Sequence, residues 1–222
     1  MWGAPRIHGE LLKLGIQIGE TSVAKYMGRR QTPPSQTWHT FLRNHVGQIV
    51  AADFFVVPTA TYRLLFVLVL LAHDRRRIRH IAVTAHPTAA WTAQQLPEAF
   101  PWDEAPRYLI HDRDYAFDRL TAKAMGIEEV LTAPRAPWQN AFVERCIGSA
   151  RRECFDHVIV FNEAGLHRLM TRYCSYHERS RTHLSLDKDT PIPRPITPPE
   201  DGAVVAIPEV GGLHHRYERR AA

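Results

Sequence analysis

The segment QIVAADFFVV, residues 48–57, decides the fold class, because it is an apolar run that carries one carboxylate near its centre. Its β-branched and aromatic residues are typical of a strand, and the apolar neighbours on both sides of Asp53 indicate a buried one. A lone aspartate in a buried strand is costly unless the carboxylate is paired or binds a metal ion. The alternative is that Asp53 lies on the solvated face of an edge strand.

Two more β-rich runs, residues 62–72 and 78–85, follow at hairpin spacing. The pattern then alternates between helices and short strands, and two long helical patterns complete the core. Three meander strands followed by this alternation predict an α/β fold with a mixed five-stranded sheet flanked by helices. The later elements are expected at residues 88–100 (helix), 107–111 (strand), 116–126 (helix), 128–132 (strand), 139–158 (helix) and 163–176 (helix).

Both ends of the chain predict smaller elements. Residues 6–30 indicate two short helices around a Gly-containing turn, the second of them basic, which is a helix-turn-helix pattern. A helical hairpin without a DNA-binding role fits the same residues equally well. Residues 31–35 (QTPPS) indicate a linker. From Thr190 the chain is rich in proline and predicts an extended arm, with a strand possible at residues 204–208.

The composition is that of a soluble globular protein, with 222 residues of which 45% are hydrophobic and 23% charged. The longest apolar run, residues 64–72, is too short to cross a membrane. The N-terminus lacks the apolar segment of a signal peptide, and Cys146, Cys154 and Cys174 lack the spacing of a zinc ribbon. We therefore expect a reduced, cytoplasmic chain without a disulfide scaffold.

Basic residues gather in two segments that flank a neutral middle, while the formal net charge of the chain is +5. Residues 1–45 carry 6 basic and 2 acidic side chains, and residues 145–183 carry 7 and 4, whereas residues 46–144 carry 10 and 11. This distribution suits a core whose edges contact DNA. Basic faces that are only solvated would give the same pattern.

Three aspartates crowd the segment HDRDYAFD, residues 111–118, directly after a short apolar strand. Asp112 ends that strand, and ligands in open α/β sheets gather at the carboxyl ends of the strands. Asp114 and Asp118 lie in the following turn and helix start, where an acid is favourable as a cap. We expect Asp112 to be a metal ligand and Asp118 a helix-start acid. Asp114 is expected either to act at the site or to face water.

Glu144 lies about one turn into the helix that follows the Pro-rich loop APRAPW, residues 133–138. Gly148 and Arg151 lie four and seven residues further along, on the same face of that helix. An acid, a small residue and a cation stacked in this way leave room for a phosphate beside a metal ion. The alternative is that Glu144 is an ordinary surface glutamate.

Asp53, Asp112 and Glu144 together form a set of hard oxygen ligands, which suits Mg²⁺ or Mn²⁺. Such a set can hold two ions on either side of a scissile phosphate, one activating the attacking oxygen and one stabilising the leaving oxygen. The histidines of the helical segments lack the paired spacing of a zinc site. The sequence therefore predicts a carboxylate site for two divalent cations.

The segments around these acids resemble those of the DDE transposases and integrases of bacterial insertion sequences, which are relatives of retroviral integrase. The resemblance covers nearly the whole chain and is carried by VAADFFVV, YLIHDRDYAF, LTAPRAPWQNAFVERCIGSARREC, YHERSRTHLSL and APRIHGELLKLGI. It implies a ribonuclease H-like catalytic core at residues 36–186. A helix-turn-helix segment with its linker is expected at residues 1–35, and a C-terminal arm at residues 187–222.

The resemblance also implies roles for individual residues. Asp53, Asp112 and Glu144 would form the catalytic triad and hold the Mg²⁺ or Mn²⁺ ions. Arg151 would contact the DNA end, and Asn140 would orient the loop or the DNA. The remaining candidates for DNA contacts are Arg145, Arg152, Arg179, Arg181 and His183.

The implied function is a transposase or integrase that cleaves and joins DNA strands by metal-dependent phosphoryl transfer, without a covalent protein intermediate. Its expected partners are double-stranded DNA, as element ends and target, and further copies of itself on that DNA. No membrane is involved, and the expected place is the nucleoid in the bacterial cytoplasm. One alternative is a truncated DNA-binding remnant without catalysis. Another is a structure-selective nuclease or ribonuclease H, against which the helix-turn-helix pattern and the C-terminal arm count.

Overall fold

The computed structural model describes most of the chain, namely residues 4–26, 37–101, 104–112, 119–134 and 136–221. By its internal contacts the chain divides into two compact units, Met1–Phe41 and Leu42–Ala222. The expectations for Asp114 and Asp118, and for the linker at residues 31–35, concern residues outside the described ranges.

The first unit contains two short helices, α1 (Ala4–Lys13) and α2 (Glu20–Tyr26), which contact each other. Gly15 lies between them with a φ of 77°, a conformation that glycine adopts without strain. Val23 of α2 is buried in this helix pair. Two helices around a Gly-containing turn are therefore confirmed, while a DNA-binding role for them stays a prediction.

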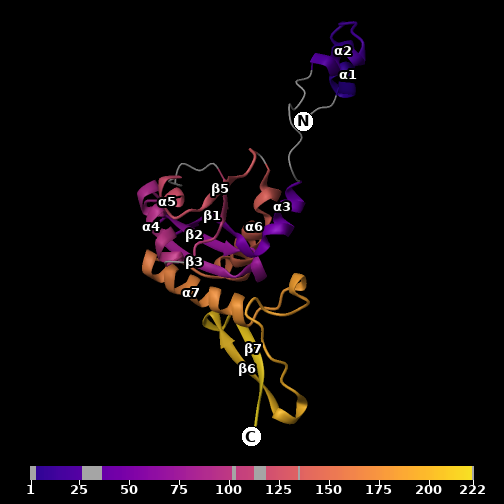
Figure 1. Cartoon of the computed structure of the whole chain (residues 1–222). Coiled ribbons are helices and arrows are strands. Elements are labelled where there is room, and N and C mark those ends of the chain that lie inside the picture. The colour runs from indigo at the N-terminus through magenta and orange to yellow at the C-terminus, as the bar shows by residue number, and fades with distance from the viewer. Residues whose placement is uncertain (1–3, 27–36, 102–103, 113–118, 135, 222) are drawn as a thin grey trace. The chain divides into compact units, whose positions relative to one another are not determined.

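The second unit is built on a mixed sheet of five strands in the order β3-β2-β1-β4-β5 (Figure 1). The pairs β1–β2 and β2–β3 are antiparallel, whereas β1–β4 and β4–β5 are parallel. This topology confirms the predicted α/β fold, with β1 at the centre of the sheet. The strands are β1 (Ile49–Pro58), β2 (Leu64–Ala72), β3 (Ile78–Thr84), β4 (Tyr108–His111) and β5 (Glu128–Leu131).

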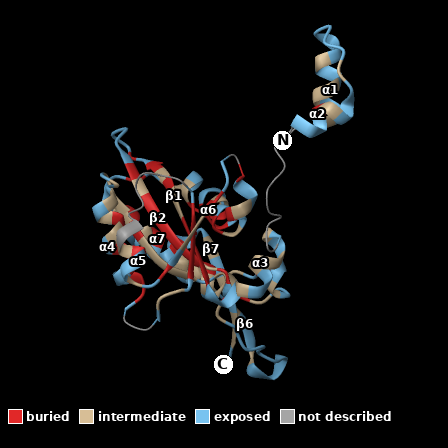
Figure 2. Ribbon diagram, turned by 45° about the horizontal axis from the view of Figure 1, so that its top comes forward, coloured by how far each residue is buried: buried red, intermediate tan, exposed pale blue. Residues whose placement is uncertain are grey.

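Helices cover both faces of this sheet, and the buried strands β1 and β2 lie between them (Figure 2). Side chains alternate along a strand, so Ala51 and Phe55 of β1 face one side of the sheet and Val50 and Ala52 face the other. The first pair packs with α6 and α7, and the second with α4 and α5. The helices are α4 (Ala89–Ala99), α5 (Arg119–Ala124), α6 (Ala141–Glu153) and α7 (Glu163–Arg179).

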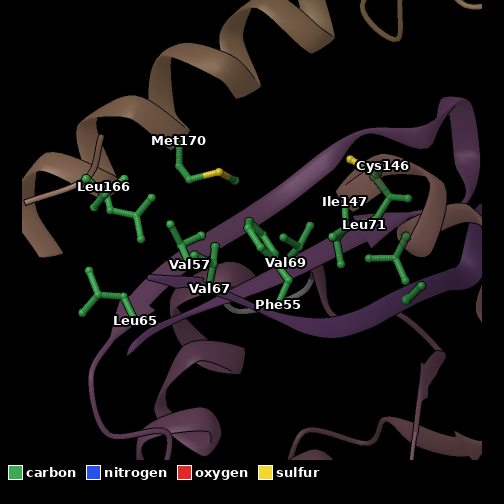
Figure 3. Packing of buried hydrophobic residues seen from close by; sticks show 13 residues of the cluster. Phe55, Val57, Leu65, Val67, Val69, Leu71, Cys146, Ile147, Leu166 and Met170 are labelled. Atoms are coloured by element: carbon green, nitrogen blue, oxygen red, sulfur yellow. The ribbon is translucent and has the colours of Figure 1, made fainter. Parts of the chain in front are cut away.

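The core between the sheet and α7 is made of aliphatic side chains from widely separated segments. Figure 3 shows Leu166 and Met170 of α7 lying over Val57 and Val67 of the first two strands. Leu166 is fully buried, with no exposed surface. The apolar spacing of α7 therefore fixes this helix on the sheet, because its buried side chains recur every three to four residues.

The C-terminal segment folds into a hairpin, where the sequence predicted an extended arm with one possible strand. β6 (Ala203–Glu209) contains the predicted strand and pairs antiparallel with β7 (His214–Arg220). The turn between them places Val210 in a buried cluster with Tyr173 of α7. The basic end of the chain is therefore a strand, since pairing with β6 satisfies its backbone groups.

A further helix, α3 (Trp38–His45), precedes β1 and was not predicted from the sequence. It has no fully buried residue, and Trp38 stacks on Phe41 with ring centroids 5.4 Å apart. None of the helices in the described part of the chain is both long and apolar enough to span a membrane.

Truncating the buried side chain of Leu166 tests this packing. We expect Leu166→Ala to lower the free energy of unfolding by about 2–5 kcal/mol, because it removes buried methyl groups and leaves a cavity. Urea titration followed by circular dichroism measures the change. Arg168→Ala, at an exposed position of the same helix, should stay within about 0.5 kcal/mol of the wild type. Equal effects of the two substitutions would contradict the packing described.

Candidate active site

The first two predicted carboxylates belong to neighbouring parts of the sheet, with Asp53 within β1 and Asp112 directly after the end of β4. The parallel ladder ends where Ala51 of β1 pairs with Ile110 of β4, and Asp53 and Asp112 each come two residues further along. Alternation along β1 places Asp53 on the same face of the sheet as Ala51 and Phe55, which is the face that packs on α6. The sheet thus brings together two acids that are 59 positions apart, counted from 53 to 112.

The strand environment of Asp53 differs from that of an edge strand. β1 is paired on both sides, so the alternative of a solvated edge position is wrong. Asp53 is nevertheless only half-buried, because β4 ends at His111 and leaves that side of β1 open from Asp53 onward. Its Oδ1 accepts a hydrogen bond from the Phe54 N–H at 2.8 Å. Partial exposure and this bond reduce the cost of placing a carboxylate here.

The start of α6 is tied to β1 next to Asp53. Asn140, in the short 3₁₀ turn Pro137–Asn140, is 5% exposed and donates from Nδ2 to the carbonyl oxygen of Ala52 at 3.1 Å. Its Oδ1 is buried and has no hydrogen-bond partner among the described residues. The expectation that Asn140 contacts DNA is therefore corrected, because a buried side chain bonded to a strand orients the loop instead.

Glu144 lies in the first turn of α6, and its side chain is exposed. Gly148 and Arg151 follow on the same helix face, and the Arg151 guanidinium lies 5.6 Å from the centroid of the Phe55 ring. Because Gly148 has no Cβ, the Arg152 guanidinium lies beside it, with Nη1 3.2 Å from where a Cβ would stand. This face of α6 therefore carries one carboxylate and two cations beside β1.

The three carboxylates are not gathered around one point. In the part of the chain that the structure describes, no group of three His, Cys, Asp or Glu side chains could hold a metal ion. The oxygens of Asp53 and Asp112 suit a hard divalent cation, and both stand on neighbouring strands. Glu144 lies on a helix face exposed to solvent.

Of the five arginines predicted to contact DNA, four are exposed and one is held in an ion pair. Arg145, Arg151, Arg152 and Arg179 are exposed. Arg181 instead forms an ion pair with Glu153, in which its Nη2 lies 2.7 Å from Oε1. Its guanidinium thus already binds a carboxylate that lies 28 residues earlier in the chain, and a contact of Arg181 with DNA stays a prediction.

The expectation that His183 faces DNA is corrected as well. Its side chain is buried, and its Nε2 donates to the carbonyl oxygen of His177 at 3.2 Å. Its Nδ1 lies 3.2 Å from Nη1 of Arg181. Burial and the neighbouring Arg181 lower the pKa of His183, although its bond to His177 opposes this. A neutral, bonded imidazole of this kind holds the segment after α7 in place.

Glu153, the last residue of α6, joins that helix to α7 and to the C-terminal hairpin. Its carboxylate accepts from Arg181 and from the hydroxyl of Tyr173, and its carbonyl oxygen accepts from Nε2 of His214 at 2.8 Å. The His214 ring stacks on Tyr176 with centroids 4.3 Å apart. Burial opposes the charge of Glu153, but hydrogen bonds and charge from Arg181 outweigh it and lower the pKa of the carboxyl.

One charged residue near these elements was missed from the sequence. Arg76 belongs to the run DRRR at residues 74–77, whose turn length favoured a plain hairpin connection. In the structure its guanidinium lies over the Phe142 ring of α6, 4.5 Å from the centroid. The sequence signal that could have indicated Arg76 was the run of three arginines at residues 75–77, because a turn does not require arginine.

Comparisons with known proteins concern the fold and one part of the chain. The model of the integrase core domain family matches residues 125–191, which include β5, α6 and α7. No curated protein sequence matches the chain.

Two solved structures share the fold. One is a chain of the simian T-cell lymphotropic virus intasome in complex with PP2A regulatory subunit B56 gamma, at 14% identity and a TM-score of 0.52, covering 96% of this chain and 86% of that one. The other is the catalytic domain of Mos1 mariner transposase, at 12% identity and a TM-score of 0.50, covering 62% of this chain and 77% of that one. At these identities the likeness shows the fold, which is the ribonuclease H-like fold of integrases and transposases.

Removing the bond from Asn140 to Ala52 tests its role as the anchor of α6. We expect Asn140→Ala to lower the free energy of unfolding by about 1–3 kcal/mol, because the buried carbonyl of Ala52 loses its donor. Hydrogen exchange should quicken at residues 137–144 and stay unchanged in the β6–β7 hairpin. Exchange that rises equally in both regions, or in neither, would show that the bond does not anchor the helix.

The pH dependence of stability tests the ion pair of Glu153. A carboxyl with a lowered pKa stabilises the fold above its unfolded pKa, near the ordinary value of 4.5, and loses this contribution as pH falls through the folded pKa. We therefore expect Glu153→Gln to cost about 1–3 kcal/mol at pH 7. The difference from wild type should shrink below about pH 4. Thermal unfolding over pH 3–7 measures it, with exposed Glu98→Gln as control, and a constant difference would refute the assignment.

Proposed function

We propose that this chain is a metal-dependent transposase or integrase that cleaves and joins DNA strands at the ends of an insertion sequence. The observation that carries the proposal is the register of β1 with β4, which places Asp53 and Asp112 each two residues beyond the last paired residues. The integrase core domain match and the ribonuclease H-like fold support it. In such a fold, the carboxyl ends of the strands are where ligands bind.

Asp53, Asp112 and Glu144 would hold two Mg²⁺ or Mn²⁺ ions. When bound, the ions would supply activation of an attacking oxygen and stabilisation of a leaving oxygen. The exposed side chain of Glu144 is free to change rotamer, because the buried face of α6 lies on the other side of the helix. The hydrogen bond from Phe54 to Asp53 and the bond from Asn140 to Ala52 hold the strand and the helix start in place.

The cations on the helix face of Glu144 would position the substrate. Arg151 and Arg152 are exposed on that face, and their planar guanidinium groups bind phosphate oxygens in pairs. Held in line with the carboxylates, a DNA end would undergo hydrolysis of one phosphodiester bond, and its freed 3′-hydroxyl would then attack the target strand. Positioning and charge neutralisation carry this type of catalysis. Since two element ends must be cut, we expect several copies of the chain to assemble on the DNA.

A second candidate is a DNA-binding remnant of such an enzyme that no longer cuts. The observation that favours it is that the described residues contain no group of three side chains able to hold a metal ion. The exposed arginines of α6 would keep the affinity for DNA in that case. The two candidates differ in one property only, which is metal-dependent cleavage.

Nicking of supercoiled and linear duplex DNA in Mg²⁺ or Mn²⁺ tests the proposal. We expect Asp112→Asn to lower the cleavage rate by about 100-fold or more, because it removes a charged oxygen from the site. Asp156→Asn, which neutralises an exposed aspartate beyond α6, is the matched control and should cleave like wild type. Equal cleavage by wild type and Asp112→Asn would refute the triad. Wild-type protein that binds DNA but does not cleave it with either ion would identify the remnant.

A further inference from the structure

A cavity of about 470 Å³ lies on the side of α6 turned away from Glu144. Phe142, Cys146 and Ser149 of α6 line it, and their spacing of three to four residues makes them one stripe of the helix. Glu144 and Arg151 belong to the opposite stripe, because positions 144 and 146 are about 200° apart around a helix. The cavity is therefore separate from the candidate active site, and α7 with residues 182–185 closes its other walls.

The charged side chains that line this cavity in the described structure are arginines. Arg76, Arg145 and Arg181 line it, and none of the lining residues in the described structure is acidic. Arg181 is neutralised by Glu153, whereas Arg76 and Arg145 form no ion pair within the described part of the chain. Burial lowers the pKa of Arg76, and the positive charge of the nearby Arg145 lowers it further. Two cations held together without a carboxylate favour an anion between them.

The wall of the cavity also holds a polar group that lacks a partner. His177 of α7 is 3% exposed, and within the described residues its buried Nδ1 has no hydrogen bond. Its Nε2 lies 3.8 Å from Sγ of Cys146. Unpaired polar atoms of buried side chains are rare in folded proteins, and this one lies beneath the surface of the cavity wall, where solvent does not reach it. It adds a polar residue to the wall beside the arginines and does not by itself mark the position of a ligand.

Arg76 is held in position at the rim. Arg76 donates from Nη1 to the hydroxyl of Ser185 and lies over the Phe142 ring. Ser185 is exposed, and so is Arg145 on the facing helix. A guanidinium that is already oriented loses little entropy when it binds, and its planar fork matches two oxygens of a phosphate.

We propose that this cavity binds a phosphate group between Arg76 and Arg145. If the chain acts on DNA as proposed above, the phosphate belongs to the DNA backbone, at a second contact on the far side of α6 from the cleaved bond. A free phosphate compound offers the same oxygens. The experiment therefore uses a duplex and pyrophosphate as two separate probes.

Binding of a labelled 30-base-pair duplex, measured by fluorescence anisotropy in EDTA over a series of salt concentrations, tests the DNA arm. We expect Arg76→Gln/Arg145→Gln to weaken binding about 10-fold or more and to flatten the slope of log K against log salt by about 1, because one phosphate contact is lost. Arg168→Gln/Arg172→Gln removes the same charge from exposed positions of α7 outside the cavity and should keep the wild-type slope. Because EDTA prevents cleavage, this result does not depend on whether the triad is catalytic.

A second pair of variants keeps both arginines. A loss of binding in these variants therefore does not come from removing the packing contacts of the arginines. Ser185→Glu places a carboxylate where Arg76 now donates to a hydroxyl, and we expect it to weaken duplex binding about as much as the double variant. Ser185→Gln has a similar size without the charge and should bind like wild type. Circular dichroism melts confirm that each variant is folded.

Pyrophosphate, added in thermal unfolding experiments, identifies the source of the phosphate. Stabilisation of wild type but not of Ser185→Glu, together with weaker duplex binding by that variant, supports the cavity as a DNA phosphate site. Stabilisation by pyrophosphate with duplex binding unchanged supports the phosphate site and refutes DNA as its source. Wild-type behaviour of Ser185→Glu with both probes would overturn the proposal.

Discussion

The candidate site depends on the parallel pairing of β1 with β4. This register places Asp53 and Asp112 each two residues beyond the last pair, Ala51 with Ile110, and so brings the two acids to the same part of the sheet. β4 ends at His111, so β1 is open on that side from Asp53 onward, and the acid is accessible although its strand is central. A one-residue shift of register would move Asp112 to the opposite face of the sheet. The positions of the two acids relative to each other therefore depend on the short ladder between β1 and β4.

The different faces of α6 carry side chains with different roles. Val143 and Ile147 pack into the core, Glu144 and Arg151 face the open end of β1, and Phe142 with Ser149 line the cationic cavity. Both ends of the helix are fixed by polar contacts, with Asn140 bonded to the carbonyl of Ala52 and Glu153 bonded to Arg181, Tyr173 and, through its carbonyl, His214. The C-terminal hairpin therefore adjoins the same helix that carries the third acid. A disturbance of the hairpin has a direct physical route to α6, through Glu153.

The sequence predicted the elements better than the partners of their polar side chains. Strand and helix positions follow from local spacing, so the five strands and the helices on both faces were confirmed. The hairpin of residues 203–220 was missed in part, because HHRYERR has no apolar alternation and is a strand only through pairing with β6. Asn140 was expected to orient the loop or the DNA, and Arg181 and His183 were expected to contact DNA. Each is engaged inside the protein, by partners that chemistry alone does not reveal.

The sequence by itself determined the fold class and the identity of the three candidate acids. Hydrophobic periodicity is a local property, and an aspartate within an apolar strand is conspicuous without any structure. Tertiary structure alone decided the register that brings Asp53 and Asp112 to the same part of the sheet, the exposed position of Glu144, and which arginines lack a carboxylate. These are distances between segments that lie far apart in the chain, and Arg76 and Arg145 face one cavity only because the fold brings β2, α6 and α7 together. Residue type sets what a side chain can bind, and packing sets what lies within its reach.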